Sequence, residues 1–207
     1  GIGVLSHLEQ KFFGAQSLVL CPTRELAEQV AAELRRLARF RANIKILTLC
    51  GGVAFGPQLG SLEHGAHIVV GTPGRVLKHL KKDSLKLDAL KSVVLDEADK
   101  MLEMGFSDEM DEVLSFVPDA VQTLLFSATI SEEVEEISKS IQQDAISVET
   151  TQEELKNEIL EEFYATNEAS REGCVVDILS LHRPKNAMIF TNTKAKADEL
   201  SAWLRRN

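Results

Sequence analysis

The feature that most constrains the fold is a short apolar run that ends in three acidic residues. Residues Ser92–Leu95 read Ser-Val-Val-Leu and lead directly into Asp96-Glu97-Ala98-Asp99. An apolar run with two β-branched residues is typical of a buried strand in a parallel sheet. Open α/β sheets bind ligands beside the carboxyl ends of their strands, which is where these acidic side chains fall. The pattern therefore predicts a parallel α/β sheet with a carboxylate site at its edge.

Carboxylates at such an edge suit Mg²⁺, which needs few protein ligands and keeps water and phosphate in its shell. Asp96 ends the strand, and we expect it to hold the metal ion through water. Glu97 comes next and is placed to orient or deprotonate an attacking water. The alternative is an acidic turn that opens a helix, where the helix dipole favours carboxylates. The residues alone leave both interpretations open.

Three further stretches follow predicted strands and offer backbone amides, hydroxyls or arginines. The free N–H groups at a helix N-terminus suit a phosphate, and arginine adds a forked donor. Glycines let a backbone approach a ligand closely, or simply allow a positive φ. An ordinary strand-to-helix turn is the alternative for each stretch. The residues are Pro22, Thr23 and Arg24, then Gly51 and Gly52, and then Thr72, Pro73, Gly74 and Arg75.

One more strand, predicted over Thr123–Phe126, leads to Ser127-Ala128-Thr129. We expect the two hydroxyls to hydrogen-bond Asp99 or Asp96 across neighbouring strand ends. The alternative is that they cap the helix expected over residues 131–143.

These stretches together resemble the DEAD-box ATP-dependent RNA helicases. The resemblance begins with motif II, Asp96-Glu97-Ala98-Asp99, and covers almost the whole chain. Around motif Ia and the glycine doublet, the sequence is similar to that of a bacterial type of these helicases. The other matching stretches stand in the family's order: Pro22–Ala27 as motif Ia, Gly51–Gly52 as the glycine doublet, Thr72–Arg75 as motif Ib and Ser127–Thr129 as motif III.

The resemblance implies a RecA-like fold, with helices on both faces of the sheet, and ATP hydrolysis between two domains. Asp96 is then the Mg²⁺ residue and Glu97 the residue that handles water, while Asp99, Ser127 and Thr129 couple hydrolysis to duplex separation. The Ia, doublet and Ib residues are expected to clamp one RNA strand by its backbone. Residues 189–193 resemble motif IV, which makes Thr193 an RNA contact of the second domain.

The expected domain organisation has three parts. Residues 1–149 are the first RecA-like domain without its phosphate-loop part, residues 150–157 are a polar linker, and residues 158–207 begin a second RecA-like domain. Strands are expected over 145–149, within 159–166 and over 187–191. No Gly-Lys pair occurs in the chain, and the D-R-G-x-D and H-R-x-G-R segments are absent. We therefore expect a chain truncated at both ends that does not hydrolyse ATP by itself.

Charge does not exclude an RNA partner. The net charge is −9, yet residues 1–100 hold 14 Lys and Arg against 10 Asp and Glu, whereas residues 101–207 hold 9 against 22. The positive excess lies in the half with the candidate RNA stretches, and local patches make phosphate contacts.

The three cysteines, Cys21, Cys50 and Cys174, have no metal-like spacing. We expect reduced thiols in a monomeric cytoplasmic protein. No apolar run approaches the roughly 20 residues that a membrane span needs.

Two other functions remain open at this point. A non-catalytic RNA-binding protein could keep the same fold, although it would not need both Asp96 and Glu97. A DNA-directed helicase of the same superfamily is the second, because contacts to the 2′-hydroxyl cannot be read from the residues.

Overall fold

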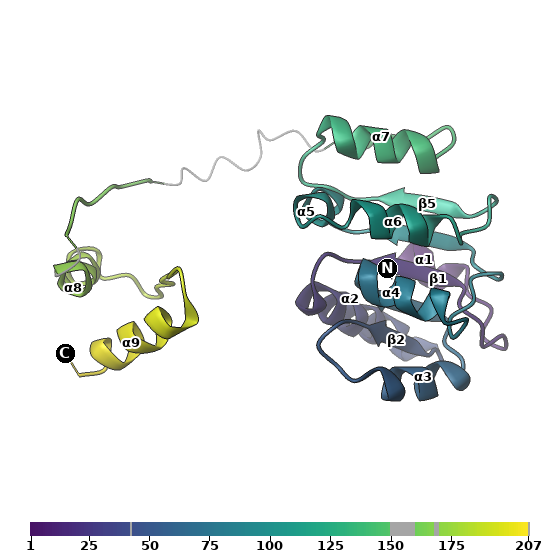
Figure 1. The fold of residues 1–207 in the computed structure, drawn as a ribbon, viewed down its shortest axis with the longest axis horizontal. Coiled ribbons are helices and arrows are strands. Elements are labelled where there is room, and N and C mark those ends of the chain that lie inside the picture. Colours follow the sequence, from purple (N-terminus) through teal and green to yellow (C-terminus); the bar gives the residue numbers. More distant parts are fainter. Residues whose placement is uncertain (42, 150–159, 168–169, 207) are drawn as a thin grey trace. The chain divides into compact units, whose positions relative to one another are not determined.

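The computed structural model describes residues 1–41, 43–149, 160–167 and 170–206 (Figure 1). They form two compact units, Gly1–Ser147 and Val148–Asn207. The predicted linker, residues 150–157, lies outside the described residues.

A five-stranded sheet with only parallel pairs forms the centre of the first unit. Its strand order is β2-β3-β1-β4-β5, as the α/β prediction requires. Leu20 lies opposite both Gly71 and Leu95, so the carboxyl ends of the central strands are level. The strands are β1 (Ser17–Leu20), β2 (Ile46–Leu49), β3 (Ile68–Gly71), β4 (Ser92–Leu95) and β5 (Gln122–Leu125).

Helices cover both faces of the sheet, as predicted. Strand side chains alternate between faces, so Leu18 and Leu20 belong to one apolar cluster while Val19 belongs to the other. The first cluster is closed by α4 (Pro73–Lys81), α5 (Ala98–Glu103), α6 (Ser107–Leu114) and α7 (Glu132–Ile141). The second is closed by α1 (Ile2–Ser6) and α2 (Arg24–Leu37).

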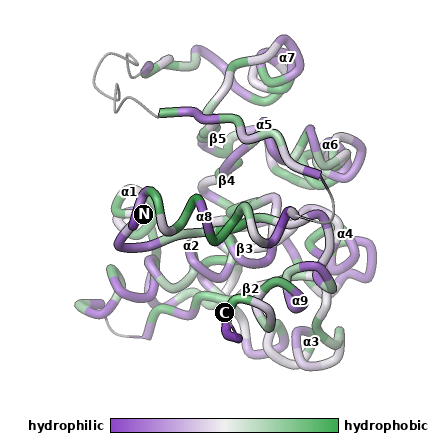
Figure 2. The backbone as a smooth tube through the Cα atoms, turned by 90° about the vertical axis from the view of Figure 1, so that its left-hand side faces the viewer, coloured by the Kyte–Doolittle hydropathy of each residue, from purple (hydrophilic) through white to green (hydrophobic). Residues whose placement is uncertain are grey.

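Helices α2, α4 and α7 are amphipathic, and Figure 2 shows hydrophobic and hydrophilic residues mixed along the helices. Thr23 caps α2 by accepting a hydrogen bond from the N–H of Leu26, as expected. Pro73 occupies the start of α4, where its missing N–H costs nothing. Thr72 stands at the N-cap of α4, but its side chain makes no capping hydrogen bond.

One helix was not predicted. α3 (Phe55–Glu63) lies between β2 and β3 and reads Phe-Gly-Pro-Gln-Leu-Gly-Ser-Leu-Glu. Two glycines and a proline disfavour a helix by propensity. Pro57 falls in the first turn, where proline is tolerated, and Leu62 packs against the core. Tertiary packing therefore decides this segment.

The second unit contains α8 (Arg171–His182) and α9 (Lys194–Leu204), which contact each other. Leu200, Trp203 and Leu204 of α9 are half-buried. No strand occurs among the described residues of this unit.

The strands predicted at 145–149, within 160–166 and at 187–191 are therefore wrong for the residues described. A strand requires a hydrogen-bonded neighbour, and none of the described strands pairs with these segments. Their apolar side chains stay in solvent: Ile146 is 90% exposed and Phe190 is 86% exposed. Residue 159, where the second of these segments begins, lies outside the described residues.

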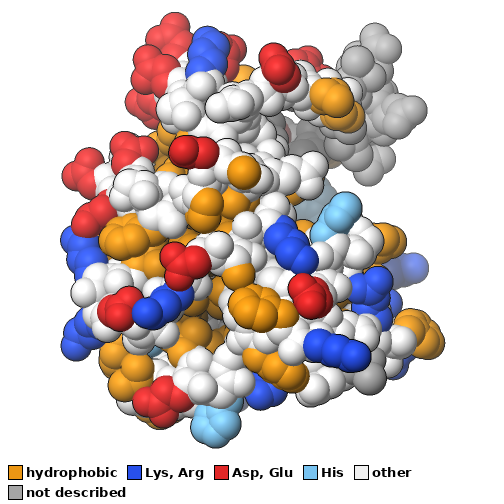
Figure 3. Space-filling view, turned by 90° about the vertical axis from the view of Figure 1, so that its right-hand side faces the viewer, with side chains coloured by type: hydrophobic (Ala, Val, Ile, Leu, Met, Phe, Trp, Pro, Cys, Tyr) orange, Lys and Arg blue, Asp and Glu red, His pale blue; other side chains and the backbone are white. Residues whose placement is uncertain are grey.

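The surface charge of the first unit is uneven. On the face drawn in Figure 3, acidic side chains gather at the top, over α7, and basic side chains lie lower. α7 carries Glu132, Glu133, Glu135 and Glu136. None of the described helices has the length and apolar character of a membrane span.

Candidate functional site

All five candidate stretches of the first unit lie on one edge of the sheet. Each follows the carboxyl end of a different parallel strand. Because Leu95 lies opposite both Leu20 and Leu125, and Gly71 lies opposite Leu49, these ends are level. The stretches, in the spatial order of the strands, are Gly51–Gly52, Thr72–Arg75, Pro22–Arg24, Asp96–Asp99 and Ser127–Thr129.

Asp96 and Glu97 form the turn that joins β4 to α5. The backbone N–H of Asp96 donates to the carbonyl of Leu20, which continues the pairing of β4 with β1. Glu97 has a φ of 54°, in the left-handed region that residues with a side chain rarely occupy. Such strained conformations are concentrated at functional sites. The turn leaves Asp96 half-buried and the side chain of Glu97 exposed.

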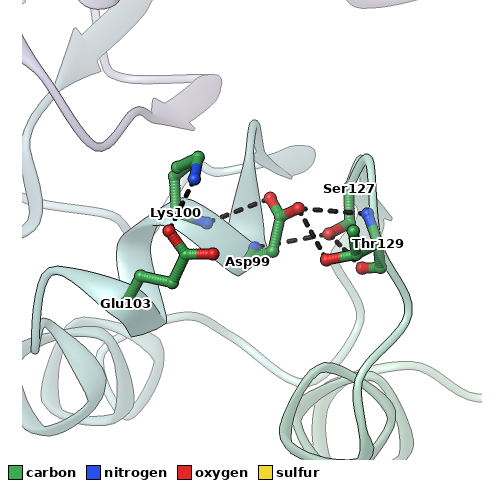
Figure 4. Close-up of polar contacts among 5 residues, drawn as sticks. All are labelled: Asp99, Lys100, Glu103, Ser127 and Thr129. Atoms are coloured by element: carbon green, nitrogen blue, oxygen red, sulfur yellow. Dashed lines mark hydrogen bonds and ion pairs between the residues drawn. The ribbon is translucent and has the colours of Figure 1, made fainter. Parts of the chain in front are cut away.

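Asp99 is tied to the end of β5 by a set of short hydrogen bonds (Figure 4). Its Oδ2 accepts from the hydroxyl of Thr129 at 2.9 Å and from the Thr129 N–H at 3.0 Å. The Ser127 hydroxyl accepts from the Asp99 N–H at 3.3 Å and donates to the carbonyl of Thr129 at 2.6 Å. The predicted bond between a hydroxyl and Asp99 is therefore confirmed for Thr129, whereas Ser127 uses backbone groups. The N-cap of α7 is Ser131, so the alternative that Ser127 and Thr129 cap this helix is wrong.

The two aspartates of this turn differ in their electrostatics. Burial raises the pKa of Asp96 above its ordinary value of 3.8, and the backbone hydrogen bond from Glu97 offsets only part of this effect. Burial acts on Asp99 in the same direction, but the hydrogen bonds from Thr129 and Lys100 outweigh it and lower the pKa of Asp99 below 3.8. Asp99 is thus a satisfied structural anion, while Asp96 is a carboxylate whose burial is only partly compensated.

Arg24 and Gly52 bring motif Ia next to the glycine doublet. Gly52 has a φ of +74°, and a Cβ there would lie 3.8 Å from Nη1 of Arg24. The position therefore requires glycine for its backbone conformation. Arg24 also pairs through Nε with Glu28 at 2.8 Å, which leaves its outer nitrogens for a ligand.

Arg75 is held in place by groups from the segment after β2. Nη1 donates to Oε1 of Gln58 at 2.7 Å, and Nη2 donates to the carbonyl of Val53 at 3.0 Å. Two of the five guanidinium N–H groups are thus used within the protein, and three are left for a ligand. Arg75 is therefore a cation held in place near the start of α4.

Gln58 is a site residue that the sequence did not predict. It is buried, and its Nε2 donates to the carbonyl of Cys50 at 3.1 Å while Oε1 also lies 3.2 Å from Nε2 of His79. Since Oε1 can only accept, Nε2 of His79 carries the proton. Burial, followed by the charges of Arg75 and two lysines, lowers the pKa of His79 to about 4, so the ring is neutral. The only signal in the sequence is a polar residue between Phe55 and Leu62.

Thr193 belongs to the second unit. It lies at the N-cap of α9, where its hydroxyl accepts from the N–H of Lys196 at 3.2 Å.

The described residues contain no group of three or more His, Cys, Asp and Glu side chains suited to a metal ion. Mg²⁺ is commonly held by only one or two carboxylates together with substrate phosphates, so Asp96 remains sufficient for that role.

Comparison with known proteins agrees with this geometry. The family model described as DEAD/DEAH box helicase matches residues 1–137. ATP-dependent RNA helicase DbpA of Escherichia coli is 51% identical over 194 residues, covering 94% of this chain and 42% of that protein. ATP-dependent RNA helicase CshA of Listeria monocytogenes is 37% identical over 205 residues, covering 99% of this chain and 39% of that protein. The chain thus spans less than half the length of these relatives.

Solved structures show the same fold. A DEAD box protein from the hyperthermophile Methanococcus jannaschii has a TM-score of 0.70 at 33% identity, over 99% of this chain and 55% of that one. S. cerevisiae Dbp5, in a variant bound to RNA and ADP BeF3, has a TM-score of 0.77 at 27% identity, over 98% of this chain and 51% of that one. The first unit is a RecA-like sheet, and the family resemblance of the sequence is confirmed. The chain belongs to the DEAD/DEAH box helicase family, among its DEAD-box RNA helicases.

Proposed function

We propose that this chain is the part of an ATP-dependent RNA helicase that holds one RNA strand and the metal ion of ATP. Residues 1–149 belong to its first helicase domain, residues 150–157 are the linker and residues 158–207 begin the second domain. The observation that carries the proposal is the level edge of the sheet, where a carboxylate turn and three stretches with groups suited to a phosphate follow neighbouring strands.

Asp96 is the residue that would hold Mg²⁺, through water. No basic side chain pairs with it among the described residues, and its pKa is raised by burial. A bound cation would stabilise the ionised form of the Asp96 carboxylate and so offset the effect of burial. When bound with ATP, Mg²⁺ neutralises charge on the phosphates. The protein's contribution is to place one carboxylate at the end of β4.

Glu97 is placed to act on the attacking water. Its side chain is exposed and makes no ion pair or hydrogen bond with the described residues, so it is free to accept a hydrogen bond from water. The left-handed backbone at Glu97 turns the chain sharply after Asp96. Two neighbouring carboxylates therefore have separate tasks, one towards the metal ion and one towards water.

Three stretches hold the RNA backbone. The start of α2 offers amides beside Arg24, the glycine doublet leaves its backbone exposed, and the start of α4 offers amides beside Arg75. Contacts of this kind hold a strand without reading its sequence. The RNA residues are then Pro22, Thr23, Arg24, Gly51, Gly52, Thr72, Pro73, Gly74 and Arg75, with Thr193 added from the second unit.

Asp99, Ser127 and Thr129 connect the ends of two neighbouring strands, β4 and β5. They join the turn after β4 to the end of β5 by three hydrogen bonds, and a fourth, from Ser127 to the carbonyl of Thr129, holds the end of β5 itself. A displacement at Asp96 or Glu97 therefore moves the segment after β5 as well, which is what coupling of hydrolysis to duplex separation needs.

The cysteines fit a cytoplasmic protein. All three are free thiols, and burial followed by the charge of Asp96 raises the pKa of Cys21 to about 12, which makes that thiol unreactive. A monomer remains the expectation from the sequence.

The proposal is tested with a chimera, in which this chain replaces the matching segment of Escherichia coli DbpA. We expect RNA to stimulate phosphate release by the chimera. The 207-residue chain alone should release none above background, because it contains no Gly-Lys pair of a phosphate loop. A folded chimera without RNA-stimulated hydrolysis, beside an active DbpA, would contradict the proposal and favour a non-catalytic RNA-binding protein. Equal stimulation by single-stranded DNA would favour the DNA-directed reading.

A further inference from the structure

A stripe of basic side chains runs along α4 from Arg75. Lys78 and Lys82 follow Arg75 by three and seven positions, the spacing of one helix face. At 1.5 Å per residue the stripe is about 10 Å long. Both lysines are exposed, so their ammonium groups reach solvent.

One aromatic ring gathers the three cations. Nζ of Lys78 lies 5.4 Å from the centroid of Phe55, Nζ of Lys82 lies 5.0 Å from it and Cζ of Arg75 lies 5.9 Å from it. The Phe55 ring itself is stacked on His79, with centroids 4.1 Å apart and an angle of 12° between the planes. The ring is thus fixed, and it holds three like charges near one another through cation–π attraction.

Lys78 and Lys82 have no carboxylate partner among the described residues, whereas other lysines of this unit form ion pairs. Lys81, between them on the same helix, pairs with Glu112 at 2.7 Å, and Lys86 pairs with Asp83 at 3.5 Å. None of the ion pairs among the described residues joins Lys78 or Lys82 to a carboxylate. Like charges kept close together without counter-charges are repulsive, and an external anion removes that repulsion.

The positive charge of the stripe also affects the neighbouring His79 ring. Burial is the largest cause of the low pKa of His79, and the charges of Arg75, Lys78 and Lys82 lower it further. The ring nevertheless stays packed and hydrogen-bonded to Gln58 and Ser84, so the fold tolerates the field.

We propose that the RNA strand held at Arg75 continues along α4, with its phosphates beside Lys78 and Lys82. The inference rests on the proposed function, because Arg75 is where the strand joins the stripe. It names a second, purely electrostatic part of the RNA surface, which no motif of the sequence marks. Lysine suits this part because it acts as a point charge on any phosphate, without a fixed geometry.

The test measures the affinity of the 207-residue chain for single-stranded oligouridylate over a range of salt concentrations. The variant Lys78→Gln/Lys82→Gln removes the stripe. The matched control Lys81→Gln/Lys86→Gln removes two charges from the same region, both of them already paired with carboxylates. Arg75→Ala is measured alongside, as the test of the clamp itself.

We expect the stripe variant to reduce the slope of log K against log salt by about 1.4, since each phosphate contact on a single strand contributes about 0.7. Its affinity at low salt should fall on the order of tenfold, while the control keeps the slope and affinity of the parent within about twofold. Equal losses in the stripe variant and the control would overturn the inference, because only general charge would then matter.

The inference and the proposed function fail in different ways. If Arg75→Ala weakens binding and the stripe variant does not, the clamp stands and the continuation along α4 is wrong. If Arg75→Ala has no effect, or the parent chain binds no oligouridylate, the clamp is wrong and the stripe is wrong with it.

Discussion

The Asp99 carboxylate accepts two hydrogen bonds from Thr129, one from the hydroxyl at 2.9 Å and one from the backbone N–H at 3.0 Å. The two residues are thirty positions apart, and they join the ends of two neighbouring strands. Asp99 is buried, so these bonds act where water does not replace them easily.

Replacing Thr129 by valine should weaken the fold in a pH-dependent way. The change removes the hydroxyl bond to an ionised acceptor, which costs about 1.5–3 kcal/mol. The pKa of Asp99 is lowered in the folded protein, so the ionised carboxylate stabilises the fold above pH 3.8. This stabilisation is lost as the pH falls through the lower folded pKa. Urea unfolding of Thr129→Val and of the parent should therefore differ at neutral pH and converge in acid.

A double-mutant cycle with Asp99→Asn provides the control for this change. We expect the two substitutions to be coupled, because one removes the hydroxyl donor and the other removes the negative charge of its acceptor. Additive losses at neutral pH would mean that the Thr129 hydroxyl does not act through Asp99.

Asp96→Asn should stabilise the chain when Mg²⁺ is absent. The folded pKa of Asp96 is raised, so its ionised form is less favourable in the folded protein. The resulting loss of stability is absent below pH 3.8 and develops as the pH rises from there through the raised folded pKa of Asp96. The gain in unfolding free energy of Asp96→Asn should follow the same course. A loss of stability at neutral pH would show that the carboxylate makes a favourable contact.

Gln58→Leu should destabilise the chain and loosen Arg75. The substitution keeps a similar volume but leaves the carbonyl of Cys50 and the Nε2–H of His79 without a partner. Each unsatisfied buried group costs about 1–3 kcal/mol. Urea unfolding measures this loss, with Ser61→Ala on the same helix as a near-neutral control. RNA affinity should fall toward that of Arg75→Ala, and an unchanged affinity would show that Gln58 does not position the arginine.

The sequence predicts the parallel sheet and the edge well, because each signal is local. A short apolar run followed by a cap residue or an acidic turn specifies both a strand and what stands at its end, as at Leu95 and Asp96. The Thr129–Asp99 bond also follows, since neighbouring strand ends bring hydroxyl and carboxylate together.

Other features depend on contacts between distant residues. The Gln58–Arg75 bond spans seventeen positions and needs α3, which Gly56, Pro57 and Gly60 disfavour locally. The strand expected at 187–191 is a short apolar run, but a strand also needs a hydrogen-bonded neighbour, and none of the described strands pairs with it. The strand expected at 145–149 fails for the same reason. The gathering of Lys78 and Lys82 at Phe55 likewise requires two helices to meet.

The division of roles between Asp96 and Glu97 is the central claim, and Glu97→Gln in the DbpA chimera tests it. Glutamine keeps the size and one acceptor oxygen of the side chain but does not take a proton. A positioned general base contributes about 10²–10⁴-fold, so we expect phosphate release at saturating ATP and RNA to fall by that order. Asp96 remains, so ATP should still bind with Mg²⁺. RNA should dissociate slowly while ATP is present, because the hydrolysis step that releases it is blocked.

The decisive measurement is paired: phosphate release and ATP affinity of the Glu97→Gln chimera, each against the parent chimera. The account predicts that turnover falls by about 10²–10⁴-fold while ATP affinity stays within a few-fold of the parent. Turnover within a few-fold of the parent would show that Glu97 is not the base. Loss of ATP affinity together with turnover would place Glu97 in the metal site and contradict the separate roles of the two carboxylates.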